Sequence, residues 1–175
     1  NAHFWGDNKQ IFGGRELIMN GTWLAVSRNM RFAAITNFRS PDKRTYLRSR
    51  GEIPRLFLNS NKSAIDFSKQ IPKNDFAGFN ALLFDGKDLV YCHNQKNSSE
   101  QHHSEVALTP GVYGLSNHLL NTAWPKVERT KPALKIAEAL SHNSAISQHL
   151  LATLQDQEVA TDEQLPNTGV GIDLE

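Results

Sequence analysis

The sequence predicts a layered α+β protein, and three observations lead to that class. Apolar segments bounded by turn signals recur through the first two thirds of the 175 residues, which is typical of antiparallel hairpins. Apolar residues occupy both faces of these segments, so we expect a sheet that is covered on both sides. Helical spacing appears early and again late in the chain. A four-layer helix-sheet-sheet-helix arrangement fits this order, although the sequence alone does not count the sheets.

Three strand pairs are predicted, each with a turn between its strands: 22–27 with 32–38, 79–84 with 88–93, and 105–108 with 112–116. Gly13-Gly14 and Asn20-Gly21 signal two further turns before the first strand. Four segments show apolar residues at three- and four-residue spacing and are predicted to be helices: 49–58, 63–71, 126–140 and 144–154. Ser49 followed by Glu52 has the pattern of a helix cap. The polar segments 94–103 and 155–165 are expected to be loops.

Composition indicates a globular protein, with 39% hydrophobic and 21% charged residues. The net charge of +1 gives no electrostatic reason to expect nucleic acid or an anionic membrane as a partner. No apolar run reaches the roughly 18 residues that a membrane span needs. Cys92 is the only cysteine, which excludes an intrachain disulfide and favours a reducing compartment, so we expect a cytoplasmic protein.

The residues offer little for metal or nucleophilic chemistry. The histidines lack a metal-binding spacing, and His102-His103 lies in a polar segment, so we expect surface histidines and no metal site. Cys92 lies on a predicted strand with nothing nearby in sequence to lower its pKa, which indicates a buried, unreactive thiol. No nucleophile elbow or phosphate-binding loop is present.

Two asparagines at predicted strand ends are better candidates. Asn37 ends the strand 32–38, and Asn117 follows the strand 112–116 in a Gly-Leu-Ser-Asn setting. Side-chain amides can donate hydrogen bonds to a developing negative oxygen without a shifted pKa. The alternative is that both amides satisfy backbone groups in turns.

Several segments resemble the NRDE-motif family, also called the transport and Golgi organisation family. The matching segments are 2–5, 14–16, 21–26, 31–39, 49–52, 79–83, 114–117, 124–127 and 165–169. This family is similar to the N-terminal nucleophile (Ntn) hydrolases, which implies antiparallel sheets in a four-layer αββα sandwich. Asn37 then corresponds to an oxyanion-hole amide, and Asn117 to a second amide near the reacting centre. We expect six further residues in or beside these segments to line a substrate pocket: Arg15, Thr22, Trp23, Arg39, Asn80 and His118.

The chain also departs from the family pattern. The family's opening Met-Cys strand and its Asn-Arg-Asp-Glu motif would precede Asn1, and a late Arg-containing strand would follow Glu175. We therefore expect one domain over residues 1–175 that lacks its first strand or strands and its C-terminal strands. Because the family nucleophile is the cysteine after the initiator Met, this chain by itself is expected to be inactive. Unpaired strand edges would favour a homo-oligomer.

The resemblance implies two functions of different classes. The first is an amidohydrolase in which the full-length protein cleaves a small amide. The alternative is a non-catalytic protein that binds and traffics haem, a lipid or acyl-CoA. In that case haem is a transported ligand and not a resident cofactor, with His93, His118 and Cys92 as candidate axial ligands.

Overall fold

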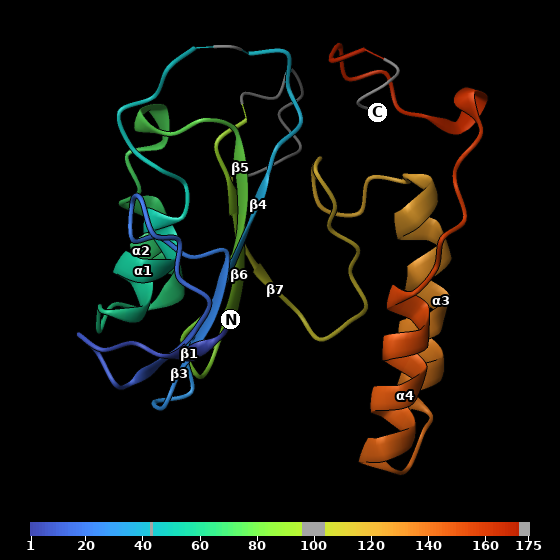
Figure 1. Ribbon diagram of the computed structural model, residues 1–175, viewed down its shortest axis with the longest axis horizontal. Helices are drawn as coiled ribbons and strands as arrows, with labels where there is room; N and C mark the ends of the chain where they lie inside the picture. Colours follow the sequence, from blue (N-terminus) through green and yellow to red (C-terminus); the bar gives the residue numbers. More distant parts are fainter. Residues whose placement is uncertain (43, 96–103, 172–175) are drawn as a thin grey trace. The chain divides into compact units, whose positions relative to one another are not determined.

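The computed structural model describes residues 1–42, 44–95 and 104–171, so most of the predicted loop 94–103 lies outside the described residues. The chain divides into two compact units. The first comprises Asn1–Phe38 and Asp42–Thr109, and the second comprises Arg39–Pro41 and Pro110–Glu175. The predicted α+β class is confirmed, because an antiparallel seven-stranded sheet and two helices form the first unit and two longer helices lie in the second (Figure 1).

The sheet is a meander in which each strand pairs with the next one in sequence. Its strands are β1 (His3–Phe4), β2 (Ile11–Gly13), β3 (Leu24–Ser27), β4 (Phe32–Asn37), β5 (Phe79–Phe84), β6 (Leu89–His93) and β7 (Glu105–Leu108). The predicted hairpins 22–27/32–38 and 79–84/88–93 correspond to β3–β4 and β5–β6. Central strand β4 also pairs with β5 along its full length, which fixes the register of the two hairpins relative to each other.

Two short helices cover one face of this sheet, here called the inner face (Figure 1). They are α1 (Glu52–Leu58) and α2 (Ala64–Lys69), followed by the 3-10 turn η1 (Lys73–Asp75). Inner-face side chains such as Ala33, Leu83 and Val90 are fully buried, and they form one core with Ile53 and Phe57 of α1.

The opposite face, here called the outer face, is also apolar. Strand register aligns two rows of side chains across it: Phe12, Val26, Phe32, Phe84, Leu89 and Leu108 in one, and Leu24, Ala34, Leu82, Tyr91 and Val106 in the other. Several of these side chains stay well exposed, among them Phe12, Leu24, Val26 and Val106. The sequence predicts a sheet that is covered on both faces. Within the first unit, only the inner face is fully covered.

The predicted turn at Gly13-Gly14 is wrong, because Gly13 belongs to strand β2. A Cβ atom at Gly13 would lie 2.7 Å from the Ala25 Cβ atom and 2.8 Å from the Leu24 carbonyl oxygen. Glycine is needed here because β2 and β3 approach each other closely, and not because the chain turns.

The predicted strand 112–116 is also wrong, since no strand forms there. The Gly114 N–H donates to Asn121 Oδ1 at 3.0 Å, and the Asn121 N–H donates to the Gly114 carbonyl at 2.7 Å. Asn121 thus forms the hydrogen bonds with the Gly114 N–H and carbonyl that a partner strand would otherwise form. Strand β7, the expected partner, pairs with β6 instead.

All four predicted helices are present, with one different cap. Gly51 and not Ser49 is the N-cap of α1, without a side-chain hydrogen bond, whereas Ser63 caps α2 by accepting from the Asp66 N–H. In the second unit, α3 (Pro125–Glu138) and α4 (Asn143–Leu154) pack as an antiparallel pair, and η2 (Asp162–Gln164) is a 3-10 turn in the predicted loop 155–165 (Figure 1). No helix in the described part of the chain is long and apolar enough to cross a bilayer.

Candidate functional site

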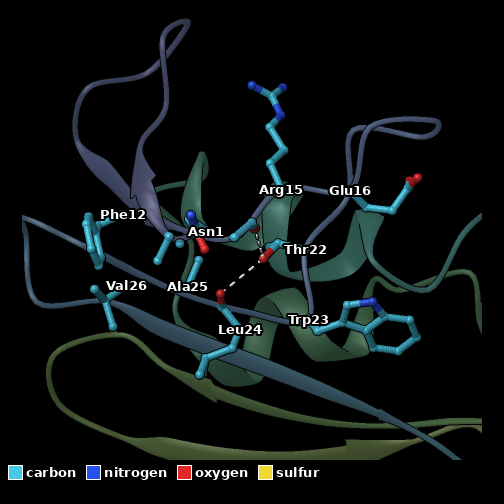
Figure 2. A pocket seen from close by; sticks show the side chains of 12 residues that line it. Asn1, Phe12, Arg15, Glu16, Thr22, Trp23, Leu24, Ala25 and Val26 are labelled. Carbon is cyan, nitrogen blue, oxygen red and sulfur yellow. Dashed lines mark hydrogen bonds between the residues drawn. The ribbon is translucent and has the colours of Figure 1, made fainter.

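An open cavity of about 700 Å³ lies in the first unit along β2 and β3, and we call it the β2–β3 cavity (Figure 2). Three predicted pocket residues line it: Arg15, Thr22 and Trp23. Most of its remaining wall consists of outer-face side chains and the start of the chain: Asn1, Ala2, Phe12, Leu24 and Val26. The cavity is therefore mainly apolar, with polar groups near one end.

Thr22 ties the end of β2 to the start of β3. Its buried hydroxyl lies 2.7 Å from the Gly14 carbonyl oxygen and 3.0 Å from the Leu24 carbonyl oxygen (Figure 2). A hydroxyl has one proton to donate, so these two carbonyls share it. The side chain of Thr22 thus holds the cavity floor in place, and its single donor hydrogen is already used within the protein.

Arg15 is oriented by a bidentate ion pair with Asp7, at 2.6 and 2.8 Å. Its guanidinium carbon also lies 4.8 Å from the centre of the Trp5 ring. The hydrogen bond from Arg15 holds the pKa of Asp7 below its usual value, so this carboxylate remains ionised. Figure 2 shows the guanidinium extending away from Leu24 and Val26, so Arg15 contributes to the rim of the cavity and not to its apolar wall.

Asn37 and Asn80 lie on adjacent strands but on opposite faces of the sheet. Asn37 is exposed at the end of β4, where it pairs with Phe79. Asn80 pairs with Thr36 and is fully buried, and its Oδ1 accepts a hydrogen bond from the Tyr91 hydroxyl at 2.7 Å. Neither residue lines the β2–β3 cavity.

Three other predicted site residues come together around Trp124 in the second unit. The guanidinium carbon of Arg39 lies 5.1 Å from the centre of the Trp124 ring, and the His118 ring centre lies 5.6 Å from it. The Arg39 N–H donates to the Asn117 carbonyl at 2.6 Å. Arg39, Asn117 and Trp124 also line a second cavity of about 510 Å³. Asn37 and Asn117 thus belong to different units, and their joint role stays a prediction.

His118 is placed to remain neutral. Its Nδ1 lies 2.9 Å from the Thr122 hydroxyl oxygen, and burial lowers its pKa from the usual value. A neutral imidazole can donate from one nitrogen and accept at the other.

Cys92 and His93, two of the candidate haem ligands, are buried side chains of β6. Burial raises the pKa of the Cys92 thiol to about 12, so the thiolate is disfavoured, and the predicted buried thiol is confirmed. No group of three or more His, Cys, Asp or Glu side chains in residues 1–42, 44–95 and 104–171 is arranged to hold a metal ion.

The sequence did not single out Phe12, Leu24 and Val26 as cavity residues. Their alternation was visible in the sequence, since Leu24 and Val26 stand two apart on a strand. The open face of the sheet depends on where α1 and α2 pack, and the strand pattern does not contain that information.

These features define an α+β protein with a ligand-sized, mainly apolar cavity on an antiparallel sheet. The family model described as "Transport and Golgi organisation 2" matches residues 1–175, and the chain belongs to this family. The Transport and Golgi organization 2 homolog of Mus musculus is 32% identical over 181 aligned residues, which cover 97% of this chain and 63% of the mouse protein. The Homo sapiens homolog is 32% identical over 178 residues, with the same two coverages. The chain thus spans less than two thirds of the relatives that it matches.

Proposed function

We propose that this chain binds a small amphipathic molecule with an acyl-like chain in the β2–β3 cavity, as a non-catalytic carrier would. The observation that carries the proposal is the cavity itself. Its volume of about 700 Å³ lies within the roughly 300–1,000 Å³ of small-molecule sites. Phe12, Leu24 and Val26 present apolar surface there, and burial of such surface drives the binding of an apolar chain.

The polar groups of the cavity also support a mainly apolar ligand. The Thr22 hydroxyl is engaged by two backbone carbonyls, and the Arg15 charge is balanced by Asp7. A ligand therefore meets few free polar partners along the wall. Arg15 and Glu16 place one positive and one negative charge at the rim of the cavity. A polar head group of the ligand would therefore lie at this rim.

A fluorescent fatty acid, cis-parinaric acid, is the probe for this proposal. We expect saturable binding, and we expect Leu24→Asp to weaken it by about tenfold or more, because a carboxylate would have to lose water against the apolar chain. Leu24 is 55% exposed, so the substitution should leave the fold intact. Leu134→Asp, on an exposed position of α3 in the second unit, is the matched control.

Adding haemin in the same titration distinguishes a fatty-acid-like ligand from haem. A shifted Soret band together with displacement of the fatty acid would indicate haem as the ligand of this cavity. If neither probe binds saturably, or if Leu24→Asp and Leu134→Asp behave alike, the carrier proposal is wrong.

We further propose that the sheet belongs to a four-layer αββα sandwich of the Ntn-hydrolase type. The support is the part of the outer face on β4, β5 and β6, which does not line the β2–β3 cavity. Two rows of apolar side chains cross these strands, as the surface between two packed sheets requires. A crystal structure of the full-length human relative is the test. A second sheet packed on any other surface, or none at all, would contradict the proposal.

Amide hydrolysis by a protein of the full length of the relatives, here called the longer protein, is a second candidate function. The exposed side-chain amide of Asn37 at the end of β4 favours it. Cys92 is excluded as its nucleophile by burial and a raised pKa, so a cysteine nucleophile would have to lie outside the described residues. Acyl-homoserine lactones and small amides are the substrates to assay with the longer protein. Loss of one oxyanion donor typically lowers kcat by about 10²–10³, which we expect for Asn37→Ala and not for the exposed turn variant Asn29→Ala. Equal activity of both variants would exclude an oxyanion role for Asn37.

A further inference from the structure

A loop beside the β2–β3 cavity carries three consecutive aliphatic side chains into solvent. Leu17, Ile18 and Met19 are 90%, 86% and 54% exposed. Single exposed apolar residues are common on protein surfaces, whereas a contiguous group usually marks an interaction site. We propose that this loop, residues 16–21, docks the first unit onto an anionic lipid surface.

The loop is held in one conformation by its own hydrogen bonds. The Glu16 carboxylate accepts from the Ile18 N–H and from the Met19 N–H, both at 2.6 Å. The Glu16 N–H donates to the Gly21 carbonyl at 2.9 Å, which closes the loop at its base. Asn20 has a φ of 55°, in the left-handed region, which lets the chain turn back toward the base of the loop. The aliphatic tip is therefore already ordered, and insertion into lipid would cost little further conformational entropy.

The base of the loop is fixed to the segment that precedes α1. The Thr22 N–H donates to the Gly51 carbonyl at 2.9 Å, and a Cβ atom at Gly21 would lie 2.8 Å from the Gly51 carbonyl carbon. Trp23 follows directly and is 48% exposed. Tryptophan is favoured at membrane–water interfaces because its indole is apolar but carries one N–H donor.

Charge favours an anionic lipid as the occupant. The guanidinium carbon of the half-buried Arg50 lies 5.9 Å from the centre of the Trp23 ring. The guanidinium donates to the Gly78 carbonyl at 3.1 Å, and among the described residues it forms no ion pair. By sequence, the first unit holds 14 of the 19 lysines and arginines and 10 of the 18 acidic residues. Anionic headgroups attract such an excess of cations. A second copy of this chain docked through the same unit would instead bring like charges together.

This inference does not depend on the ligand of the β2–β3 cavity. Glu16 belongs to both the loop and the rim of the cavity, so docking would bring the cavity to the lipid surface. Vesicle binding without any fatty acid tests the docking alone, and titration with fatty acid in the absence of vesicles tests the cavity alone.

Vesicle flotation of the 175-residue chain is the experiment. We expect flotation with vesicles that contain roughly 30% phosphatidylserine in phosphatidylcholine, much less with pure phosphatidylcholine, and a decline as salt is raised. The double variant Leu17→Asp/Ile18→Asp should reduce the bound fraction by about tenfold or more. Met30→Asp is the matched control, because Met30 is also an exposed apolar turn residue of the first unit, 73% exposed, and it should bind like the wild type.

Ile18→Ser alone supplies a milder variant, and circular dichroism confirms that each variant is folded. If the wild type floats with neither vesicle, or if the double variant floats as well as the wild type, the proposal is wrong. A concentration-dependent dimer that the double variant abolishes, without vesicle binding, would show that the loop docks a second copy and would also overturn it.

Discussion

The hydrogen bond between Tyr91 and Asn80 provides a quantitative test of how the outer face is held together. The Tyr91 hydroxyl donates to Asn80 Oδ1 at 2.7 Å, and Asn80 Nδ2 lies 3.4 Å from Thr36 Oγ1. Asn80 is fully buried and Tyr91 is 5% exposed. The carboxamide of Asn80 thus links three neighbouring strands, β4, β5 and β6. We expect Asn80 to act mainly through the stability of the sheet.

Tyr91→Phe removes one hydroxyl and leaves the Asn80 Oδ1 atom buried without that donor. A buried polar group that loses its partner costs about 1–3 kcal/mol, so we expect the free energy of unfolding to fall by that amount. For a chain of this size, each kcal/mol lowers Tm by roughly 2–4 °C. In the double variant Tyr91→Phe/Asn80→Leu both partners are absent, so the loss should be smaller than the sum of the two single losses, with a coupling of about 1 kcal/mol.

Urea unfolding followed by circular dichroism measures these differences. Tyr46→Phe is the control, because Tyr46 makes its hydrogen bonds to Asp42 and Arg44 at the surface, and a change within about 0.5 kcal/mol is expected there. Additive losses for Tyr91 and Asn80 would refute the coupling. Unchanged stability together with weaker cis-parinaric acid binding would show instead that Asn80 serves the ligand.

Arg31, Cys92 and His118 supply three further predictions; the first two are buried and the third is half-buried. Arg31→Met should lower the free energy of unfolding by about 2 kcal/mol, because the buried guanidinium donates to the Phe57 and Lys62 carbonyls; wild-type stability in urea would contradict this. Cys92 should resist Ellman's reagent at about pH 8 until denaturant is added, since burial raises its pKa to about 12; rapid labelling of the native protein would contradict its burial. Burial lowers the pKa of His118 in the folded chain, so the unfolded chain binds its proton more readily. Stability should therefore fall as pH drops below about 6.5, the unfolded pKa, and His118→Phe should flatten this slope in thermal unfolding at several pH values.

The elements predicted correctly are those that local sequence determines. Strands β5 and β6 flank a short turn at Asp85-Gly86-Lys87, and Gly86 has the positive φ of 98° that such a turn needs. Ser63 marks the start of α2 because its hydroxyl satisfies a backbone N–H that the helix itself leaves free. In both cases the deciding contacts lie within a few residues of one another, so the sequence pattern contains them.

The wrong predictions concern segments whose conformation depends on contacts with residues outside the segment itself. Gly13 is a strand residue because Ala25 of the next strand comes too close for a side chain. Residues 112–116 have strand-like composition, but Asn121 takes the backbone hydrogen bonds of Gly114. The apolar wall of the β2–β3 cavity, formed by Phe12, Leu24 and Val26, escaped prediction for the same reason, since it joins residues of two strands.

Electrostatics shows how the division into units changes a conclusion drawn from the whole chain. A net charge of +1 gives no reason to expect an anionic surface as a partner. The first unit nevertheless holds most of the cations, and the second holds 8 of the 18 acidic residues with only 5 of the 19 basic ones. Attraction to a surface falls off within about 10 Å at ordinary ionic strength, so the charges of the unit that docks count for more than the sum over the chain. An exclusion based on net charge therefore applies to the chain as a whole and leaves the first unit free to associate with anionic lipid.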